Sequence, residues 1–303
     1  GEGDFGSCIF KKRNAQSYFA IQTFAAPIVQ TQGTAQGFHF DNSNMKPIVN
    51  NEGWKKAFEL YKATGKYGPP DELNMDIGDT RALFKAGRCG LIVEWGDPGT
   101  LQLDDDAKSI RGKMYAISAV GSTEVLDRAT GKLVPVSAAT APYAVDGINY
   151  APFAAFGGWA GAVNKGADAK TKAAAYAFLS YMNQAAQSGI DVTIGATGYN
   201  PYRTSQLAST DLWVKAGMPK ALADNYLGAI NGAINNLNMA SDMKIPGAQK
   251  YTSVVLDTEL ARYLAGEITV DEALANIEEG WEEVTEDFGR DEQVASQALA
   301  LGL

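Results

Sequence analysis

The chain has 303 residues, of which 46% are hydrophobic and 20% are charged, and its net charge is −9. This composition is typical of a globular protein, and the length is sufficient for two lobes with buried cores. The negative charge disfavours nucleic acid as a partner, because its phosphates are bound by clustered Lys and Arg side chains. No apolar run approaches the ~18 residues that span a membrane. The first residues are not a signal peptide, and we expect any secretion signal to lie upstream or to have been removed.

Residues that carry enzyme chemistry are scarce. His39 is the only histidine, so a His-rich metal site cannot form, and its aromatic neighbours indicate a packed or surface residue. Neither a phosphate-binding glycine loop nor a complete dinucleotide fingerprint is present. The acidic tracts at 104–106 and 278–283 lie in polar patterns typical of a solvated surface. We therefore predict that the protein is not an enzyme and has no catalytic residue, metal or cofactor.

The two cysteines are Cys8 and Cys89. They are too few for a disulfide framework or for a four-cysteine zinc site. A single disulfide between them and two free thiols are both open alternatives at this point.

Helix signals alternate with a few strand signals through the first 190 residues and dominate the last 100, which indicates an α/β protein with a helical tail. Strands are expected over 8–10, 33–41, 89–95 and 113–120 and after a glycine-rich entry within 156–164. Residues 96–99 are expected to form a loop after a buried strand, and 121–156 to be irregular. Helices are expected over 14–26, over 80–86 behind an Asp79 cap, and over 168–187, 211–217, 219–232 and 251–265.

Two further helices are predicted by caps and apolar stripes. Asn50 or Asn51 caps a helix that places Trp54, Phe58 and Tyr61 on one face. The segment 269–272 has the form of a capping box, and the helix that follows ends at Gly289. Its apolar stripe, which we expect to be core, is Leu274, Ile277, Trp281, Val284 and Phe288. The helix over 168–187 carries a comparable apolar side, consisting of Ala174, Phe178, Tyr181 and Met182.

Three stretches, in this order, resemble the family 1 extracellular solute-binding proteins, the maltose-binding-protein class of ABC transporter proteins. The first is DTRALFKAGRCGL at 79–91, followed by EWG at 94–96. The second is GGW at 157–159 with AVN at 162–164 and KTKAAAYAFLSY at 170–181. The third is GYNPYRTS at 198–205, followed by LAGEITVDEAL at 264–274. The runs at 6–18 and 151–159 also resemble a green-algal subgroup found as ectodomains of membrane proteins, some with nucleotide-cyclase domains.

The resemblance implies a type II periplasmic-binding-protein-like fold, α/β, with two lobes joined by a hinge and a helical C-terminal part. It assigns 1–112 to part of the second lobe, with a ligand-facing loop at 95–99. It assigns 113–190 to a segment that returns to the first lobe, and 191–303 to a helical remainder that lies mainly in the second lobe. The family's opening portion has no counterpart, so we expect an incomplete first lobe. Either an upstream segment or a separate chain completes it, or the lobe is reduced; of these we favour a missing upstream piece.

A sugar site needs an aromatic platform and a few polar groups. Trp95 and Asp97 follow a strand at a glycine loop, and Gly158 and Trp159 lie in the glycine-rich entry. Each of these residues has an alternative as a core, capping or hinge residue. The resemblance adds Tyr18, Tyr199, Arg203 and Tyr251 to the candidate ligand-binding residues, with an ion pair within the protein as the alternative for Arg203.

These observations predict a protein that binds a small polar solute, such as a sugar or polyol, in an interlobe cleft. The expected location is extracellular or periplasmic, either free or tethered to a membrane, and the expected partners are a membrane transporter or a receptor. One alternative is a scaffold or interaction module that keeps the fold without the ligand. A carbohydrate-active enzyme is the other, and it needs two carboxylates flanking a cleft.

Overall fold

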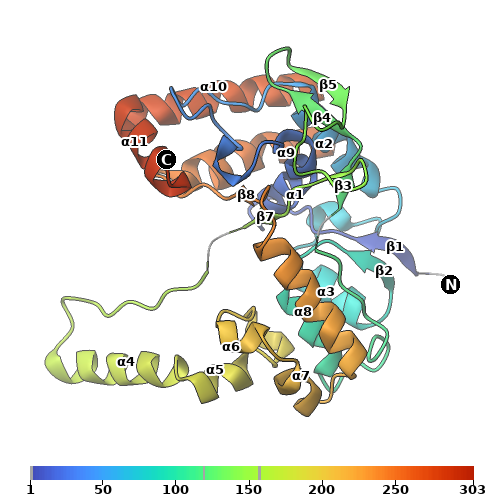
Figure 1. Ribbon diagram of the computed structural model, residues 1–303, viewed down its shortest axis with the longest axis vertical. Helices are drawn as coiled ribbons and strands as arrows, with labels where there is room; N and C mark the ends of the chain where they lie inside the picture. The colour runs from blue at the N-terminus through green and yellow to red at the C-terminus, as the bar shows by residue number, and fades with distance from the viewer. Residues whose placement is uncertain (1–2, 119, 156–157) are drawn as a thin grey trace. The chain divides into compact units, whose positions relative to one another are not determined.

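The computed structural model describes residues 3–118, 120–155 and 158–303 (Figure 1). The chain divides into two compact units, each built from segments that are distant in sequence. Unit 1 consists of 1–94, 118–156 and 232–303, and unit 2 consists of 95–117 and 157–231. The predicted boundaries at 112 and 190 concern the family's lobes and stay predictions. The assignment of segments to the family's first and second lobes stays a prediction.

Unit 1 contains helices that pack around an aromatic core. α1 (Ser17–Val29) lies against α2 (Glu52–Thr64), and α10 (Val270–Phe288) packs on α2 and on α9 (Asp257–Ala265). The remaining helices of this unit are α3 (Ile77–Lys85) and α11 (Arg290–Leu301), and a π-helical turn over Lys250–Leu256 leads into α9.

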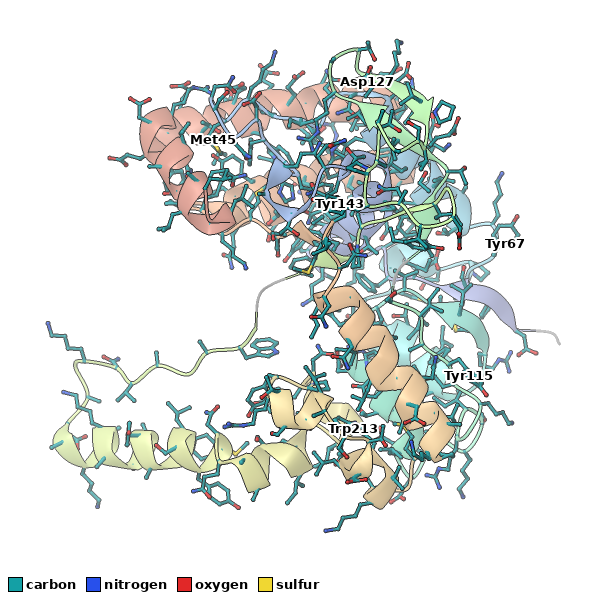
Figure 2. The ribbon with its side chains drawn as sticks, in the orientation of Figure 1. Met45, Tyr67, Tyr115, Asp127, Tyr143 and Trp213 are labelled. Carbon is teal, nitrogen blue, oxygen red and sulfur yellow. A yellow bond between two sulfur atoms is a disulfide. The ribbon has the colours of Figure 1, made fainter. Side chains whose placement is uncertain are left out.

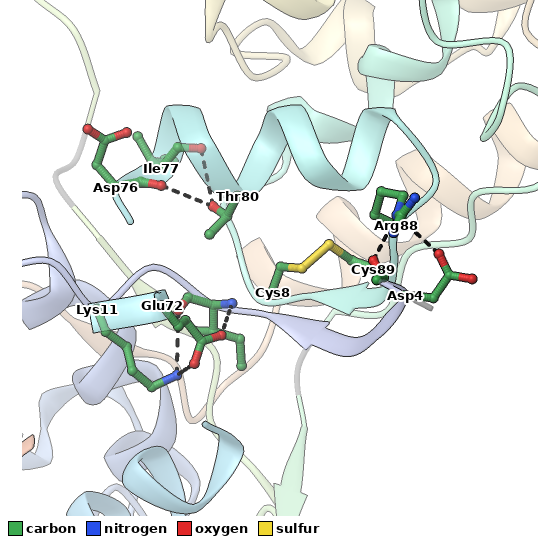
Figure 3. The surroundings of a disulfide bond; sticks show 11 residues. Asp4, Cys8, Lys11, Glu72, Asp76, Ile77, Thr80, Arg88 and Cys89 are labelled. Atoms are coloured by element: carbon green, nitrogen blue, oxygen red, sulfur yellow. Dashed lines mark hydrogen bonds and ion pairs between the residues drawn. A yellow bond between two sulfur atoms is a disulfide. The ribbon is translucent and has the colours of Figure 1, made fainter. Parts of the chain in front are cut away.

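The strands of unit 1 form small sheets. β1 (Phe5–Cys8) pairs in parallel with β2 (Cys89–Ile92), and β4 (Glu124–Asp127) forms an antiparallel hairpin with β5 (Lys132–Pro135). Two shorter pairs are antiparallel β3 (Gly121–Ser122) with β6 (Asn149–Tyr150) and parallel β7 (Phe153–Ala154) with β8 (Ala240–Ser241). A disulfide between Cys8 and Cys89 joins β1 to β2 (Figure 3).

The predicted stripes of α2 and α10 meet in the core of unit 1. Trp54 and Trp281 are fully buried with ring centroids 6.4 Å apart. His39 lies between aromatic rings and is 3% exposed, with its ring centroid 5.9 Å from that of Trp281. Burial lowers the pKa of His39 to about 3, so this imidazole is neutral at physiological pH. It is thus a packed residue.

Unit 2 is helical. Its helices are α4 (Ala169–Met182), α5 (Ala185–Asp191), α6 (Thr204–Leu207), α7 (Asp211–Lys215) and most of α8 (Lys220–Ile234). Trp213 of α7, labelled in Figure 2, is fully buried and packs with Tyr226 of α8, with ring centroids 6.0 Å apart. No strand is assigned to the described residues of unit 2.

The strand predictions need several corrections. The first strand ends at Cys8 instead of spanning 8–10, and 33–41 holds only a short 3-10 turn and an isolated bridge. The strand expected over 89–95 stops at Ile92, and Leu91 is 51% exposed because its sheet has only two strands among the described residues. The segment 113–118 forms no strand, and neither does 158–164, while residues 156 and 157 lie outside the described part.

Two segments expected to lack regular structure have some. The stretch 121–156 contains the β4–β5 hairpin, which turns at Gly131 with φ +70°. The segment 96–99 was expected to be a loop, but a 3-10 helix begins at Asp97 and continues to Leu103. Pro98 lies in the first turn of this helix, where the missing proline N–H costs no hydrogen bond.

Helix ends also differ from the prediction. α1 begins at Ser17 and continues through Pro27 to Val29, because the proline removes only one bond near the helix end while Ile28 and Val29 are buried. α3 is capped by Asp76, and Asp79 completes its capping box. The helix over 168–187 is interrupted at Asn183. The Asn51 cap and the Thr269–Glu272 capping box are confirmed.

Candidate functional site

The loop that carries Trp95 and Asp97 is held by its own hydrogen bonds. The N–H of Gly99 donates to the carbonyl of Gly96 at 3.1 Å, and the hydroxyl of Thr100 donates to the carbonyl of Asp97 at 2.8 Å. These bonds turn the chain into the 3-10 helix and fix Trp95 at its entry. Trp95 is half-buried in this position.

Close backbone approach brings a second loop of unit 2 against the first. A Cβ added at Gly195 would lie 2.8 Å from the Cα of Leu101, and one added at Gly96 would lie 2.5 Å from Oδ1 of Asn200. At Gly195 the neighbour is backbone, so only glycine permits the approach, whereas at Gly96 the neighbour is the end of the Asn200 side chain, which can shift. Consequently the predicted residues Trp95, Asp97 and Tyr199 lie in two loops that pack together, although about a hundred residues separate them in sequence.

Asp97 differs from Trp95 in burial. It is 3% exposed and lies near Tyr226, whose pKa is raised strongly, first by burial and then by the charge of Asp97. Its backbone carbonyl helps to hold the loop, and Trp95 and Tyr199 offer more accessible surface than Asp97 does. Asn200 was missed by the sequence reasoning, because only the structure shows that it lies beside Gly96.

Arg203 has partners within unit 2. Its Nε donates to the hydroxyl of Ser188 at 3.1 Å, and its Nη2 donates to the carbonyl of Asn183, the residue that caps α4. The guanidinium also lies 5.6 Å from the ring centroid of Tyr202. The partners are a hydroxyl and a carbonyl, so the alternative of an ion pair is corrected to a hydrogen-bonded clamp on the α4–α5 junction.

Gly158 and Trp159 lie in a run without regular secondary structure. Gly158 has φ +113°, a conformation that favours glycine, and Trp159 is 79% exposed. The structure therefore presents an accessible aromatic ring at this position.

Two predicted residues belong to unit 1. Tyr18 is half-buried near the start of α1; burial raises its pKa, and a hydrogen bond with Ser253 lowers it in part. Tyr251 was predicted to bind the ligand, and the structure contradicts this prediction. It has no exposed surface, and its hydroxyl pairs with Thr285 at 2.9 Å and accepts from Gln293 at 3.2 Å, so it is a core residue and cannot contact a solute.

A pocket of about 530 Å³ in unit 1 lies away from all predicted residues. Asp41, Lys46, Arg128 and Glu278 are among the residues that line it, and they come from three distant segments, which explains why no sequence pattern indicated it. Arg128 donates to the carbonyls of Gly37 and Val29 at 2.6 and 3.2 Å. Its charge therefore serves to tie loops together.

The described residues show neither a cluster of metal ligands nor a membrane-spanning helix. Within residues 3–118, 120–155 and 158–303, no group of three or more His, Cys, Asp or Glu side chains could hold a metal ion. No helix of the described residues is long and apolar enough to cross a bilayer. The disulfide is of a kind that persists in oxidising compartments outside the cytoplasm.

The fold is similar to that of solved ABC transporter solute-binding proteins. One, from Agrobacterium vitis with bound D-mannitol, has a TM-score of 0.58 and 19% identity over 95% of this chain and 62% of its own. A second, from Agrobacterium radiobacter in complex with ribitol, has a TM-score of 0.63 and 17% identity over 93% and 60%. Maltose-bound MalE3 of T. maritima has a TM-score of 0.63 and 15% identity over 93% and 61%.

No protein-family model and no curated protein matches the sequence. The structural likeness shows an α/β periplasmic-binding-protein fold, and this chain spans about 60% of the length of the solute-binding proteins it resembles. The predicted fold class is thereby confirmed.

Proposed function

We propose that the protein binds a small polar solute, a sugar or a polyol, and that it does so outside the cytoplasm for transport or for sensing. The observation that carries the proposal is the likeness to proteins with bound D-mannitol, ribitol and maltose, together with the packing of the Trp95 and Tyr199 loops in unit 2. A half-buried indole ring offers an apolar face to a sugar ring, and neighbouring amide and phenol groups pair with hydroxyls.

Within this proposal, Trp95 is the aromatic platform and Tyr199 and Asn200 are its polar neighbours. Asp97 fixes the loop. Tyr18, Gly158, Trp159 and Arg203 remain proposed contributors, and Tyr251 is left out because it is buried. The expected partners beyond the solute are a membrane transporter or a receptor assembly.

Titration with D-mannitol, ribitol and maltose, followed by tryptophan fluorescence and calorimetry, tests the proposal. Trp95→Ala should weaken binding at least about tenfold, which corresponds to about 1.4 kcal/mol. Tyr67→Ala is the matched control, because this aromatic residue is 67% exposed in unit 1 and lies outside the proposed set. Equal affinities for wild type and Trp95→Ala would show that the site lies elsewhere.

The alternative function is a scaffold of the same fold that binds no solute. It is favoured by the limited coverage of the solute-binding proteins, about 60% of their length. Absence of a heat or fluorescence change with all three solutes at about 10 mM favours this alternative, because any Kd would then lie above about 10 mM, roughly 5.5 kcal/mol weaker than a micromolar Kd.

A further inference from the structure

The pocket of about 530 Å³ in unit 1 belongs to a part of the chain that the proposed solute site does not depend on. Its lining residues lie between 36 and 51, between 126 and 131, and at Glu278, all within unit 1, whereas Trp95 and Tyr199 belong to unit 2. The volume is within the range of pockets that hold small molecules, about 300–1,000 Å³. The pocket is therefore a candidate site in its own right.

Arg128 reaches the pocket from a hydrogen-bonded hairpin turn. It follows Asp127 (labelled in Figure 2), whose carboxylate accepts the N–H of Ala129 at 3.0 Å and the hydroxyl of Thr130 at 2.7 Å. The N–H of Gly131 donates to the carbonyl of Asp127 at 2.8 Å and closes the turn. Since these bonds fix the backbone around Arg128, its side chain is placed at the pocket before any ligand arrives.

The positive charge of Arg128 forms no ion pair among the described residues. Three of its five N–H groups donate to neutral carbonyls, those of Gly37, Val29 and Gln36. Its Nε is buried and has no hydrogen-bond partner among the described residues. Burial lowers the pKa of Arg128 to about 10, and the charge of Asp41 raises it in part, so the guanidinium stays charged at neutral pH. A half-buried cation of this kind is stabilised by an anion.

A second cation, Lys46, lines the same pocket. Its backbone N–H donates to Oδ1 of Asn44 at 2.8 Å, and its carbonyl accepts the N–H of Asp41 at 2.9 Å, so a hydrogen-bonded turn holds its backbone. Its side chain is exposed and forms neither an ion pair nor a hydrogen bond within the described part of the chain. The ammonium on its flexible stem is therefore available to an anion in the pocket.

The two acidic residues of the pocket, Asp41 and Glu278, are partly hydrogen-bonded already. Oδ1 of Asp41 accepts the N–H and the hydroxyl of Ser43 at 2.8 and 2.6 Å, and Oε2 of Glu278 accepts Nδ2 of Asn50 at 2.8 Å. The second oxygen of each carboxylate can accept a hydrogen bond from a hydroxyl group. The pocket thus combines two cations that lack ion pairs with acceptors for hydroxyls.

We propose that this pocket is a second binding site, which takes a hydroxylated small molecule with one oxyanion group, a carboxylate or a phosphate. Arg128 and Lys46 bind the oxyanion, and Asp41 and Glu278 accept hydrogen bonds from its hydroxyls. A guanidinium matches the geometry of both kinds of oxyanion. A neutral sugar leaves the two cations uncompensated, and an amine places a further cation beside them. Both fit the pocket less well.

The test measures how four probes with the same sugar ring bind to the 303-residue chain by calorimetry: D-glucuronate, glucose 6-phosphate, D-glucose and D-glucosamine. We expect at least one of the two anions to bind at least about tenfold more tightly than D-glucose and D-glucosamine, and about 0.5 M NaCl to weaken its binding. The anion that binds more tightly identifies the oxyanion as carboxylate or phosphate. No binding of either anion at about 10 mM, or equally tight binding of D-glucose or D-glucosamine, would overturn the proposal.

Variants locate the binding. Lys46→Glu should weaken the bound anion at least about fivefold, because an exposed attraction becomes a repulsion. Lys66→Glu is the matched control and should not weaken it, since Lys66 is also exposed in unit 1 but does not line the pocket. Arg128→Gln should weaken the anion at least about 30-fold. Circular dichroism checks that this variant is folded, and if it is not, Lys46→Glu decides.

The proposed solute site is tested separately from this pocket. Trp95→Ala should leave anion binding unchanged, and Lys46→Glu should leave unchanged any binding of D-mannitol, ribitol or maltose. Anion binding that is lost in Trp95→Ala but kept in Lys46→Glu would place the anion at the solute site and overturn the second site. Either proposal can therefore fail while the other holds.

Discussion

The ammonium of Lys11 forms an ion pair with the carboxylate of Glu72, and each residue is 3% exposed (Figure 3). The same carboxylate accepts the N–H of Ile9 at 2.9 Å, and Nζ of Lys11 lies 5.0 Å from the ring centroid of Tyr61. Burial lowers the pKa of Lys11, and the bond to Glu72 raises it in part. The pair fastens the segment after β1 to a loop sixty residues away.

Removing one partner of the Lys11–Glu72 pair should lower the free energy of unfolding more than removing both charges does. Lys11→Met leaves a buried carboxylate without its cation, and we expect a loss of about 3–5 kcal/mol in the free energy of unfolding. Adding Glu72→Gln should restore part of it, because the amide oxygen can still accept from Ile9. Urea unfolding of the wild type, the single variant and the double variant measures both steps. A double variant less stable than Lys11→Met would contradict this account.

His39 should make stability fall as the pH is lowered. Burial holds its pKa at about 3 in the folded protein, below about 6.5 for the unfolded chain. Between these values the unfolded state binds a proton that the folded state does not, so the free energy of unfolding should fall by up to about 1.4 kcal/mol per pH unit. Above about pH 6.5 the residue makes no contribution.

The matched variant is His39→Gln, which cannot titrate. Subtracting its pH profile from that of the wild type removes the carboxylates and leaves the histidine. Since His39 is the only histidine in the chain, its ring signals in an NMR spectrum are also unambiguous. Ring signals that shift between pH 8 and pH 5 in the folded protein would show that the imidazole is not held neutral.

The sequence predicted best where capping and periodicity act within one helix. The Asn51 cap, the Trp54–Phe58–Tyr61 face and the Trp281 stripe are all local patterns, and the structure has them. Strands were predicted poorly because an apolar run does not show how many neighbours it will have. The segment 89–95 is such a case, since a two-stranded sheet leaves Leu91 exposed.

The sequence predicted individual residues of the candidate site but not how their loops pack, because packing depends on segments that are distant in sequence. Trp95 and Tyr199 could be named from their loops, but the packing of the two loops depends on the close backbone approach at Gly195, which no spacing reveals. Tyr251 carried the same aromatic signal and proved to be core. Its carbonyl accepts a hydrogen bond from Nε1 of Trp281 at 2.8 Å, and its hydroxyl pairs with the hydroxyl of Thr285. Both partners lie on α10, so the burial of Tyr251 depends on how α10 packs and cannot be predicted from the local sequence.

The Cys8–Cys89 disulfide closes a loop across 81 residues of sequence separation. Replacing both cysteines by serine should lower the free energy of unfolding by about 2–4 kcal/mol, because the unfolded chain regains the freedom of that loop. Guanidinium unfolding with and without a reductant provides the comparison, and the serine variant should not respond to the reductant. Two titratable thiols in the untreated native protein would contradict the bond.

Two glycines of unit 2 should respond in opposite directions to alanine. At Gly195 a methyl group would meet backbone atoms of Thr100 and Leu101 at 2.8 to 3.0 Å, so the Trp95 and Tyr199 loops would have to separate. We expect Gly195→Ala to destabilise the protein by about 1–3 kcal/mol. If the proposed site is correct, solute affinity should fall with it.

Gly228 is the matched position, because it lies exposed in α8 with nothing within 4 Å of an added Cβ. Gly228→Ala should raise stability by about 1 kcal/mol through helix propensity alone and leave solute affinity unchanged. Thermal unfolding and fluorescence titration of both variants measure the two effects together. Equal stability changes at the two positions would mean that the two loops do not pack as closely as the Gly195 backbone indicates, and the proposed site would lose this support.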